Sequence, residues 1–268
     1  MTADAVLRTT RAGERDEVLV LTLDRPAALN AIDDALLAAL HRALDAIEGE
    51  VAGDPLTIRA VIVSGAGDRA FSTGMDLKER ASFDDDRLRA QRAEVVRLIT
   101  RVHALPVPVI AAVEGYALAG GFELALACDL IVAARPAVFG LPEVAVGIFP
   151  GGGSTQTLTW LVGPARARDV ILTGRRLTAD EAEAWGVVAR VVDEGTALDG
   201  ALELAGAMAR GAPLGIRQAR RAIARAHRAL ADGMADEHEL YETVLVSDDR
   251  REGFSAFAEK RPPRFTGR

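Results

Sequence analysis

Runs of apolar residues alternate with helix-like patterns along the first half of the chain. Four runs rich in Val, Ile and Leu predict buried strands at residues 16–26, 58–67, 108–115 and 129–134. Apolar residues at helical spacing predict helices over 33–50 and 87–104. Buried strands that alternate with helices indicate a parallel sheet with helices around it, so the expected fold class is α/β.

The pattern changes near residue 200, where strand signals become rare. Helical patterns follow one another at residues 200–212, 213–231, 234–246 and 248–260. The prolines of "RPPRF" end the last helix, because proline cannot continue one. We therefore divide the chain into an α/β core, residues 1–199, and a helical C-terminal module, residues 200–268.

The segment "AGGFELALACDL", residues 119–130, predicts a helix that is apolar on every side and therefore buried. Glu123 nevertheless lies in its first turn. One interpretation is structural: an acid in the first turn stabilises the helix dipole or forms a capping box, although Gly120 occupies the place of the usual Ser or Thr. The other is functional, since the free N–H groups of a helix start can stabilise an oxyanion beside a carboxylate.

Composition narrows the classes of function. The chain has 268 residues and a formal net charge of -7, which argues against nucleic acid as a partner. Its one cysteine, Cys128, excludes an intrachain disulfide and a cysteine-based metal site, and agrees with a cytoplasmic location. The N-terminus has no secretory signal pattern, and no apolar run reaches the length of about 18 residues that a membrane span requires.

Three loops contain glycines beside a side chain that could take part in catalysis: residues 69–79, 114–130 and 139–156. Glycine has no side chain, so the backbone of these loops can come close to a ligand. Glu143 follows Pro142 in an apolar setting. A lone buried glutamate is usually structural, whereas two beside one anion site can act as acid and base on a single water. No histidine lies in these loops or at ligand spacing from another, so we expect no metal site.

The loops "AFSTGMDLKE", "GYALAGGFELALACDL" and "FGLPEVAVGIFPGGGSTQ" together resemble the crotonase superfamily, the enoyl-CoA hydratase/isomerase family. The segments "LTGRRLTADEAEAWGVVARVV" and "EGFSAFAEKRPPRF" match it as well, so the resemblance covers nearly the whole chain. It implies a spiral of β-β-α units with a C-terminal helical module that forms trimers, commonly paired into hexamers.

The resemblance also implies a set of site residues. The oxyanion hole falls on the backbone N–H groups of Met75 and Gly120, and the two catalytic glutamates fall on Glu123 and Glu143. The positions that contact substrate or coenzyme A are Ala27, Ala28, Leu29, Met75, Asp76, Leu77, Lys78, Gly120, Tyr241 and Lys260. Lys78 and Lys260 are the only lysines of the chain, and both fall on positions that the family uses for CoA.

The activity implied is that of an enoyl-CoA hydratase in fatty acid metabolism, a lyase that adds water to a 2-trans-enoyl-CoA as in β-oxidation. Such an enzyme needs no metal or redox cofactor, and CoA belongs to the substrate. Two alternatives stay open: an enoyl-CoA isomerase, which uses mainly one glutamate, and a non-catalytic member that binds acyl-CoA or RNA. The acyl chain length is not set by the sequence, although Met75 is expected to reshape the acyl pocket.

Overall fold

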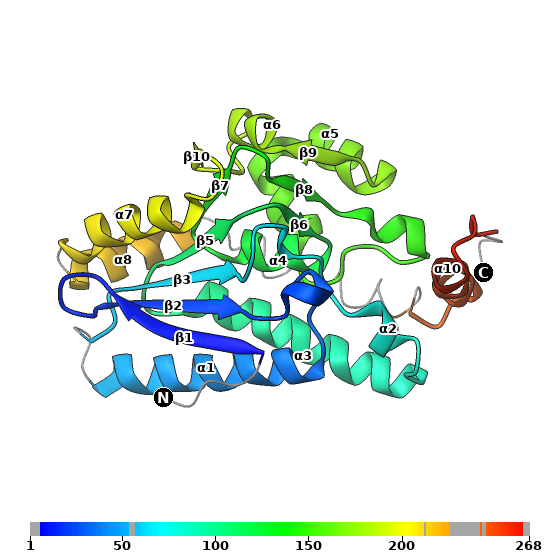
Figure 1. Cartoon of the computed structure of the whole chain (residues 1–268), viewed down its shortest axis with the longest axis horizontal. Helices are drawn as coiled ribbons and strands as arrows, with labels where there is room; N and C mark the ends of the chain where they lie inside the picture. The colour runs from blue at the N-terminus through cyan, green and yellow to red at the C-terminus, as the bar shows by residue number, and fades with distance from the viewer. Residues whose placement is uncertain (1–5, 54–56, 212, 226–241, 243–244, 265–268) are drawn as a thin grey trace.

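A twisted six-stranded sheet lies at the centre of the molecule (Figure 1). The computed structural model describes residues 6–53, 57–211, 213–225, 242 and 245–264. The strands of this sheet, in spatial order, are β1 (Leu7–Ala12), β2 (Val18–Leu23), β3 (Ala60–Gly65), β5 (Val109–Val113), β7 (Leu130–Ala134) and β10 (Arg190–Val192). All neighbours are parallel except β1 and β2, which are antiparallel. The predicted α/β class is confirmed.

A second sheet is built from four strands of three residues each. They are, in spatial order, β4 (Ala70–Ser72), β6 (Tyr116–Leu118), β8 (Val138–Gly140) and β9 (Arg176–Thr178). Three of these strands follow a strand of the large sheet directly: β4 follows β3, β6 follows β5, and β8 follows β7. A helix then follows each pair, which gives the repeated β-β-α unit. The loops that leave β4, β6 and β8 therefore lie at one edge of the small sheet.

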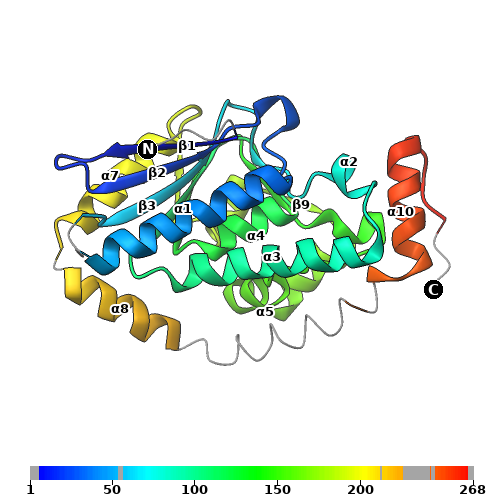
Figure 2. The same cartoon turned by 90° about the horizontal axis from the view of Figure 1, so that it is seen from below.

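Helices cover both faces of the large sheet. Their bounds are α1 (Asp34–Gly53), α2 (Leu77–Arg80), α3 (Asp85–Ala104), α4 (Gly120–Ala127), α5 (Ser154–Thr173), α6 (Ala179–Ala184), α7 (Ala197–Ala209), α8 (Pro213–Arg225) and α10 (Asp248–Glu259), with short 3-10 helices η1 (Pro26–Ala28) and η2 (Pro142–Val146). Helices α1 and α3 lie side by side (Figure 2). The kink in α5 falls at Gly163, with φ of 79°, just before Pro164.

The core explains why the strands appear as continuous apolar runs. Leu19 and Leu21 of β2 face a large cluster that includes α1, α3 and α4, whereas Val18 and Val20 face the opposite side. There the small side chains of α7 complete a second cluster with Ala197, Ala201 and Ala205. Helix α7 thus packs on the core sheet, although most of it falls within the predicted C-terminal module. The boundary at residue 199 stays a prediction.

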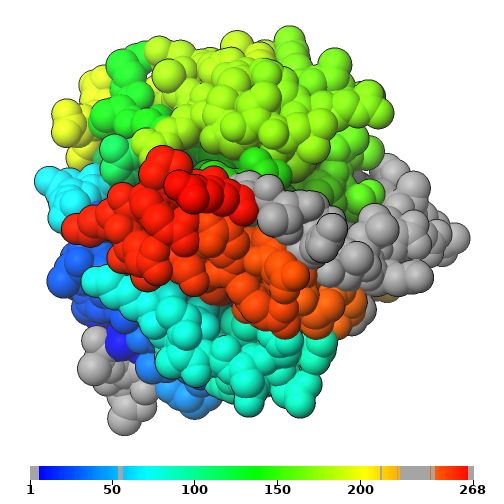
Figure 3. Space-filling view, turned by 90° about the vertical axis from the view of Figure 1, so that its right-hand side faces the viewer, coloured from blue at the N-terminus to red at the C-terminus, as the bar shows by residue number. Residues whose placement is uncertain are grey.

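Helix α10 lies away from the sheets and packs on η2. Two glycines permit the contact: a Cβ on Gly253 would lie 2.3 Å from the carbonyl oxygen of Val146, and one on Gly147 would lie 2.3 Å from that of Asp249. Figure 3 shows α10 crossing the face between the α2–α3 region and the α5 region. No helix in the described part of the chain is long and apolar enough to cross a membrane.

Candidate active site

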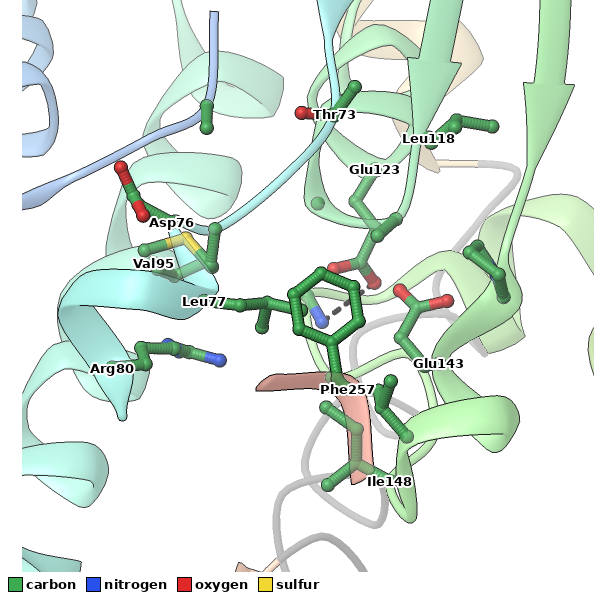
Figure 4. A pocket seen from close by; sticks show the side chains of 18 of the residues that line it. Thr73, Asp76, Leu77, Arg80, Val95, Leu118, Glu123, Glu143, Ile148 and Phe257 are labelled. Atoms are coloured by element: carbon green, nitrogen blue, oxygen red, sulfur yellow. Dashed lines mark hydrogen bonds between the residues drawn. The ribbon is translucent and has the colours of Figure 1, made fainter. Parts of the chain in front are cut away.

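A cavity of about 650 Å³ opens where the loops after β4, β6 and β8 meet (Figure 4). Ten of the predicted site residues line it: Ala27, Ala28, Leu29, Met75, Asp76, Leu77, Lys78, Gly120, Glu123 and Glu143. Phe257 of α10 also borders the cavity, whereas Lys260, the residue that ends α10, does not. Tyr241 lies outside the described residues. The fold therefore brings together four segments that are far apart in sequence.

The backbone approaches itself closely at Gly74 and Gly120. Strands β4 and β6 are parallel neighbours, so the residues that follow them meet. Gly74 has φ of 86°, and a Cβ there would lie 2.8 Å from the backbone nitrogen of Gly120. The Cβ position of Gly120 in turn lies 3.7 Å from the backbone nitrogen of Met75. Glycine at position 74 is required for this contact.

Within the described part of the chain, the N–H of Met75 does not bond to its bridge partner Ile32, and the N–H of Gly120 does not bond within α4. The N–H of Ile32 donates to the Gly74 oxygen (2.7 Å), and the N–H of Asp76 donates to the Ile32 oxygen (2.9 Å). These two bonds flank Met75 in a parallel bridge, so its own N–H points away from Ile32. In α4 the N–H of Glu123 bonds to the Ala119 oxygen, so the N–H of Gly120, further toward the start, has no acceptor within the helix.

Glu123 reaches from α4 to the start of α5. Its Oε1 accepts hydrogen bonds from the N–H of Gly152 (2.8 Å), the hydroxyl of Ser154 (2.9 Å) and the N–H of Ser154 (3.4 Å). All three of these bonds end on Oε1. The N–H of Ala119, which the glutamate of a capping box would bind, donates instead to the Gly140 oxygen (2.9 Å). The capping-box interpretation of Glu123 is therefore wrong, whereas its place in the first turn of α4 agrees with the helix-dipole interpretation.

Burial sets the electrostatics of Glu123. Loss of solvent raises its pKa above the ordinary value, while the bonds from Gly152 and Ser154 and the positive charge of Arg92 oppose the rise. Glu143 is also buried and comes from η2, which starts with Pro142. Figure 4 shows the two carboxyl groups pointing into the same space. Two carboxyl groups so placed can exchange protons with one bound molecule.

Comparison with known proteins identifies the family. A sequence profile described as "Enoyl-CoA hydratase/isomerase" matches residues 13–268. The chain belongs to the enoyl-CoA hydratase/isomerase family. It is 42% identical to the 2,3-dehydroadipyl-CoA hydratase of Escherichia coli over 95% of this chain and 97% of that protein.

Solved structures of the enoyl-CoA hydratase/isomerase family share the fold. A carnitinyl-CoA hydratase from Mycobacterium avium has a TM-score of 0.86 at 35% identity, and the match covers 100% of this chain and 100% of that chain. An enoyl-CoA hydratase from Bacillus anthracis has a TM-score of 0.78 at 36% identity, with 98% of this chain and 100% of that chain covered. The resemblance to the crotonase superfamily and the crotonase-like fold are thus confirmed.

The backbone is strained directly before α4. Ala119, the residue that precedes this helix, has φ of 49° and ψ of -130°. An L-residue in such a conformation costs on the order of 1–3 kcal/mol. Ala119 lines the cavity, so this strain lies at the start of the helix that carries Gly120 and Glu123.

Several residues that position this family site were not found from the sequence. Gly152 and Ser154 lie in "FPGGGSTQ", a run that the sequence alone did not connect with Glu123. Asn30 is fully buried, with φ of 54°, and its amide donates to the oxygens of Ala66 (3.0 Å) and Ala70 (2.7 Å). These bonds fix the segment after η1 against β4. An asparagine directly after a predicted CoA-facing segment was the only available signal.

Asp76, a predicted CoA contact, has a structural role as well. Its Oδ1 accepts from the N–H groups of Lys78 (3.1 Å) and Glu79 (3.4 Å), so it caps α2. Partial burial acts to raise its pKa, but the hydrogen bond from Arg25 and the two backbone bonds outweigh burial and lower it. Among the described residues, no group of three or more His, Cys, Asp or Glu side chains is placed to hold a metal ion.

Proposed function

We propose that the protein is an enoyl-CoA hydratase, which adds water syn across the double bond of a 2-trans-enoyl-CoA to give a 3-hydroxyacyl-CoA. The observation that supports this most strongly is the pair of buried carboxyl groups, Glu123 and Glu143, in one cavity beside two candidate backbone N–H donors. Family membership supports the broader class of enoyl-CoA hydratase or isomerase.

The backbone donors act on the thioester. When water adds at C3, negative charge moves through C2 to the thioester oxygen. In the proposal this oxygen accepts hydrogen bonds from the N–H groups of Met75 and Gly120. Donors fixed in advance in a site shielded from water stabilise such charge, and removal of one typically costs about 3 kcal/mol.

The glutamates handle the protons. Oε1 of Glu123 is already bonded to the start of α5, so Oε2 is the atom that we assign to the water. Glu123 chiefly takes a proton from the water as its oxygen bonds to C3, and Glu143 chiefly delivers a proton to C2. Transfer of a proton between the two restores the starting state, and the pair titrates as a unit. No metal or redox cofactor is needed in this scheme.

Coenzyme A is assigned to the mouth of the cavity. Ala27, Ala28 and Leu29 offer backbone groups there, and Lys78 supplies positive charge for the phosphates. Lys260 does not line the cavity of its own chain, so we assign it, with Tyr241, to CoA bound at a subunit boundary. Two of these assignments therefore depend on assembly.

We further propose that the chain forms homo-trimers, paired into hexamers as dimers of trimers. Large apolar side chains are exposed at Trp160 (55%), Leu172 (68%) and Ile223 (64%), and exposed apolar surface often marks an interface. Light scattering of the full chain tests the assembly: a monomer at micromolar concentration contradicts it. The cytoplasmic location and a role in β-oxidation stay predictions, which fractionation of the native host and a gene deletion would test.

A substrate panel tests the activity itself. Crotonyl-CoA, longer and branched 2-enoyl-CoAs, and 3-enoyl-CoAs are followed by the absorbance of the conjugated thioester. A hydratase removes this absorbance from 2-enoyl-CoAs. An isomerase creates it from 3-enoyl-CoAs, and faster appearance than removal would favour that alternative. Binding without either change would favour a non-catalytic acyl-CoA-binding member.

A further inference from the structure

Two arginine side chains border the same cavity. Arg80 ends α2 and is 7% exposed, and Arg92, from α3, is 3% exposed. Figure 4 shows Arg80 reaching toward the cavity from the side of α2, while Glu123 and Glu143 approach from the other side. Arg92 acts on Glu123 through its charge, whereas Arg80 has no role in the hydration scheme above. The burial of Arg80 therefore requires a separate explanation.

Arg80 is held in place at one nitrogen only. Its Nε donates to Oε1 of Gln91 (2.6 Å), and the amide nitrogen of Gln91 donates to Asp34 (2.7 Å). Within the described part of the chain, no carboxylate forms an ion pair with Arg80, and no acceptor receives its terminal nitrogens. Gln91 thus fixes the plane of the guanidinium and leaves its outer edge toward the cavity.

Arg92 is engaged differently. Its Nη2 approaches the Gly151 oxygen (3.4 Å), and its charge acts on Glu123 by lowering the pKa of that carboxyl. Arg92 therefore interacts with the loop before α5 and with Glu123. Arg80 is the cation whose outer edge faces the substrate space.

A purely hydrocarbon acyl group would leave this charge unmatched. A guanidinium stays protonated at any physiological pH, and enclosing it without a counter-ion is unfavourable. An apolar acyl chain would remove the remaining water from Arg80 and return no hydrogen bond. A carboxylate would match the planar edge of the guanidinium with two parallel charge-assisted hydrogen bonds.

We propose that the acyl group of the natural substrate ends in a carboxylate, so that the substrate is a CoA monothioester of an unsaturated dicarboxylic acid, and that the terminal nitrogens of Arg80 bind this carboxylate. The reaction on that substrate rests on the proposed hydratase function, but the binding preference does not. The phosphates of CoA are another source of negative charge, and the experiment separates the two sources.

The first measurement uses the unmodified full chain and saturated thioesters, which cannot be hydrated. Succinyl-, glutaryl- and adipyl-CoA are titrated beside butyryl-, pentanoyl- and hexanoyl-CoA, which match them in carbon number, and beside free CoA. At the best-fitting length we expect the acid to bind about 10- to 100-fold more tightly than its neutral partner, as for one charged hydrogen-bonded pair. Equal affinities at all three lengths would overturn the proposal.

The second measurement assigns the preference to Arg80. In Arg80→Gln the ratio of affinities for acid and neutral thioester should fall to about one, and Arg80→Lys should restore part of it, because it keeps the charge without the planar edge. The matched control is Arg97→Gln on α3, which removes an arginine whose side chain is 58% exposed and which does not line the cavity. That variant should keep the full ratio.

The outcomes are distinct. If Arg80→Gln weakens free CoA and every thioester equally and keeps the ratio, Arg80 binds a CoA phosphate and the proposal is wrong. If Arg80→Gln does not fold, Arg80→Lys decides the assignment: a ratio equal to that of the unmodified protein would show that the planar edge of Arg80 does not bind the carboxylate, and the proposal is wrong. If the acids bind more tightly but neither crotonyl-CoA nor an unsaturated dicarboxylic thioester is hydrated, the carboxylate site stands and the hydratase function fails.

Discussion

The contact between α4 and β4 can be tested at two adjacent glycines. A Cβ on Gly121 would lie 2.2 Å from the Ser72 carbonyl oxygen, whereas the nearest atom to a Cβ on Gly120 would be the Gly74 Cα at 3.5 Å. Neither glycine has a positive φ, so alanine suits both backbones. The two substitutions add the same methyl group, one into a closed contact and one into the cavity wall.

Gly121→Ala should damage both stability and activity. Real Cβ contacts do not fall below 3.0 Å, so strand and helix must separate by about 0.8 Å, and the obstructing atom is backbone that cannot rotate away. Overpacking of this kind costs about 1–3 kcal/mol, and a displacement near 1 Å between the donors of Met75 and Gly120 can lower turnover about 100-fold.

Gly120→Ala should separate the two effects. Its methyl group meets only ordinary contacts, so the free energy of unfolding should change by less than about 0.5 kcal/mol. The same methyl lies 3.7 Å from the Met75 nitrogen, where the thioester oxygen has to bind, so hydration should fall about 10-fold or more. Denaturant titration and steady-state hydration of crotonyl-CoA measure both quantities. A fully stable Gly121→Ala, or a fully active Gly120→Ala, would refute this geometry.

Three further predictions concern the carboxyl groups and the strained turn. Glu123→Gln and Glu143→Gln should each lower hydration at least 100-fold while CoA-thioester affinity stays within a few-fold, measured by kinetics and titration, since the amide keeps shape but cannot transfer a proton. Burial raises the folded-state pKa of Glu123, so the stability from its protonated form is complete below about pH 4.5 and is lost as pH rises through the folded pKa. Glu123→Gln cannot ionise, so the free energy of unfolding of this variant, relative to the parent, should be higher at about pH 8 than at about pH 5. The same difference at both pH values would contradict the prediction. Ala119→Gly should stabilise the fold by about 0.5–1 kcal/mol in denaturant titrations with turnover unchanged, because glycine adopts the positive φ without strain; a destabilised variant would show that Ala119 is not strained.

The long elements of the fold follow from the sequence, whereas the short ones do not. The predicted strand at 108–115 appears as β5, because it is a continuous apolar run, and the predicted helix at 87–104 appears as α3, because it is long enough to show the helical period. Strands β4, β6 and β8 have three residues each, too few for alternation to be visible. These strands are formed by tertiary pairing, and they carry the loops of the site.

Some residues of the candidate site could be identified from the sequence, and others could not. Residue type and motif identified Glu123, Glu143 and the two backbone donors as candidates. The burial of Arg80 could not be foreseen, because "DLKER" has the composition of an exposed helix turn and only packing against Gln91 of α3 removes the guanidinium from water. Periodicity describes one element at a time, whereas this contact joins two.

Three locally unfavourable features come from two elements, the start of α4 and the end of α2. Ala119 has a positive φ before α4, Glu123 is a carboxyl group buried in α4, and Arg80 is a guanidinium buried at the end of α2. All three line one cavity. Strained and buried polar residues occur elsewhere as well, but these three surround the space that would hold one ligand. Their common location supports a ligand that carries charge at both ends of its acyl group: a thioester oxygen that becomes anionic near Gly120 and a carboxylate that meets Arg80.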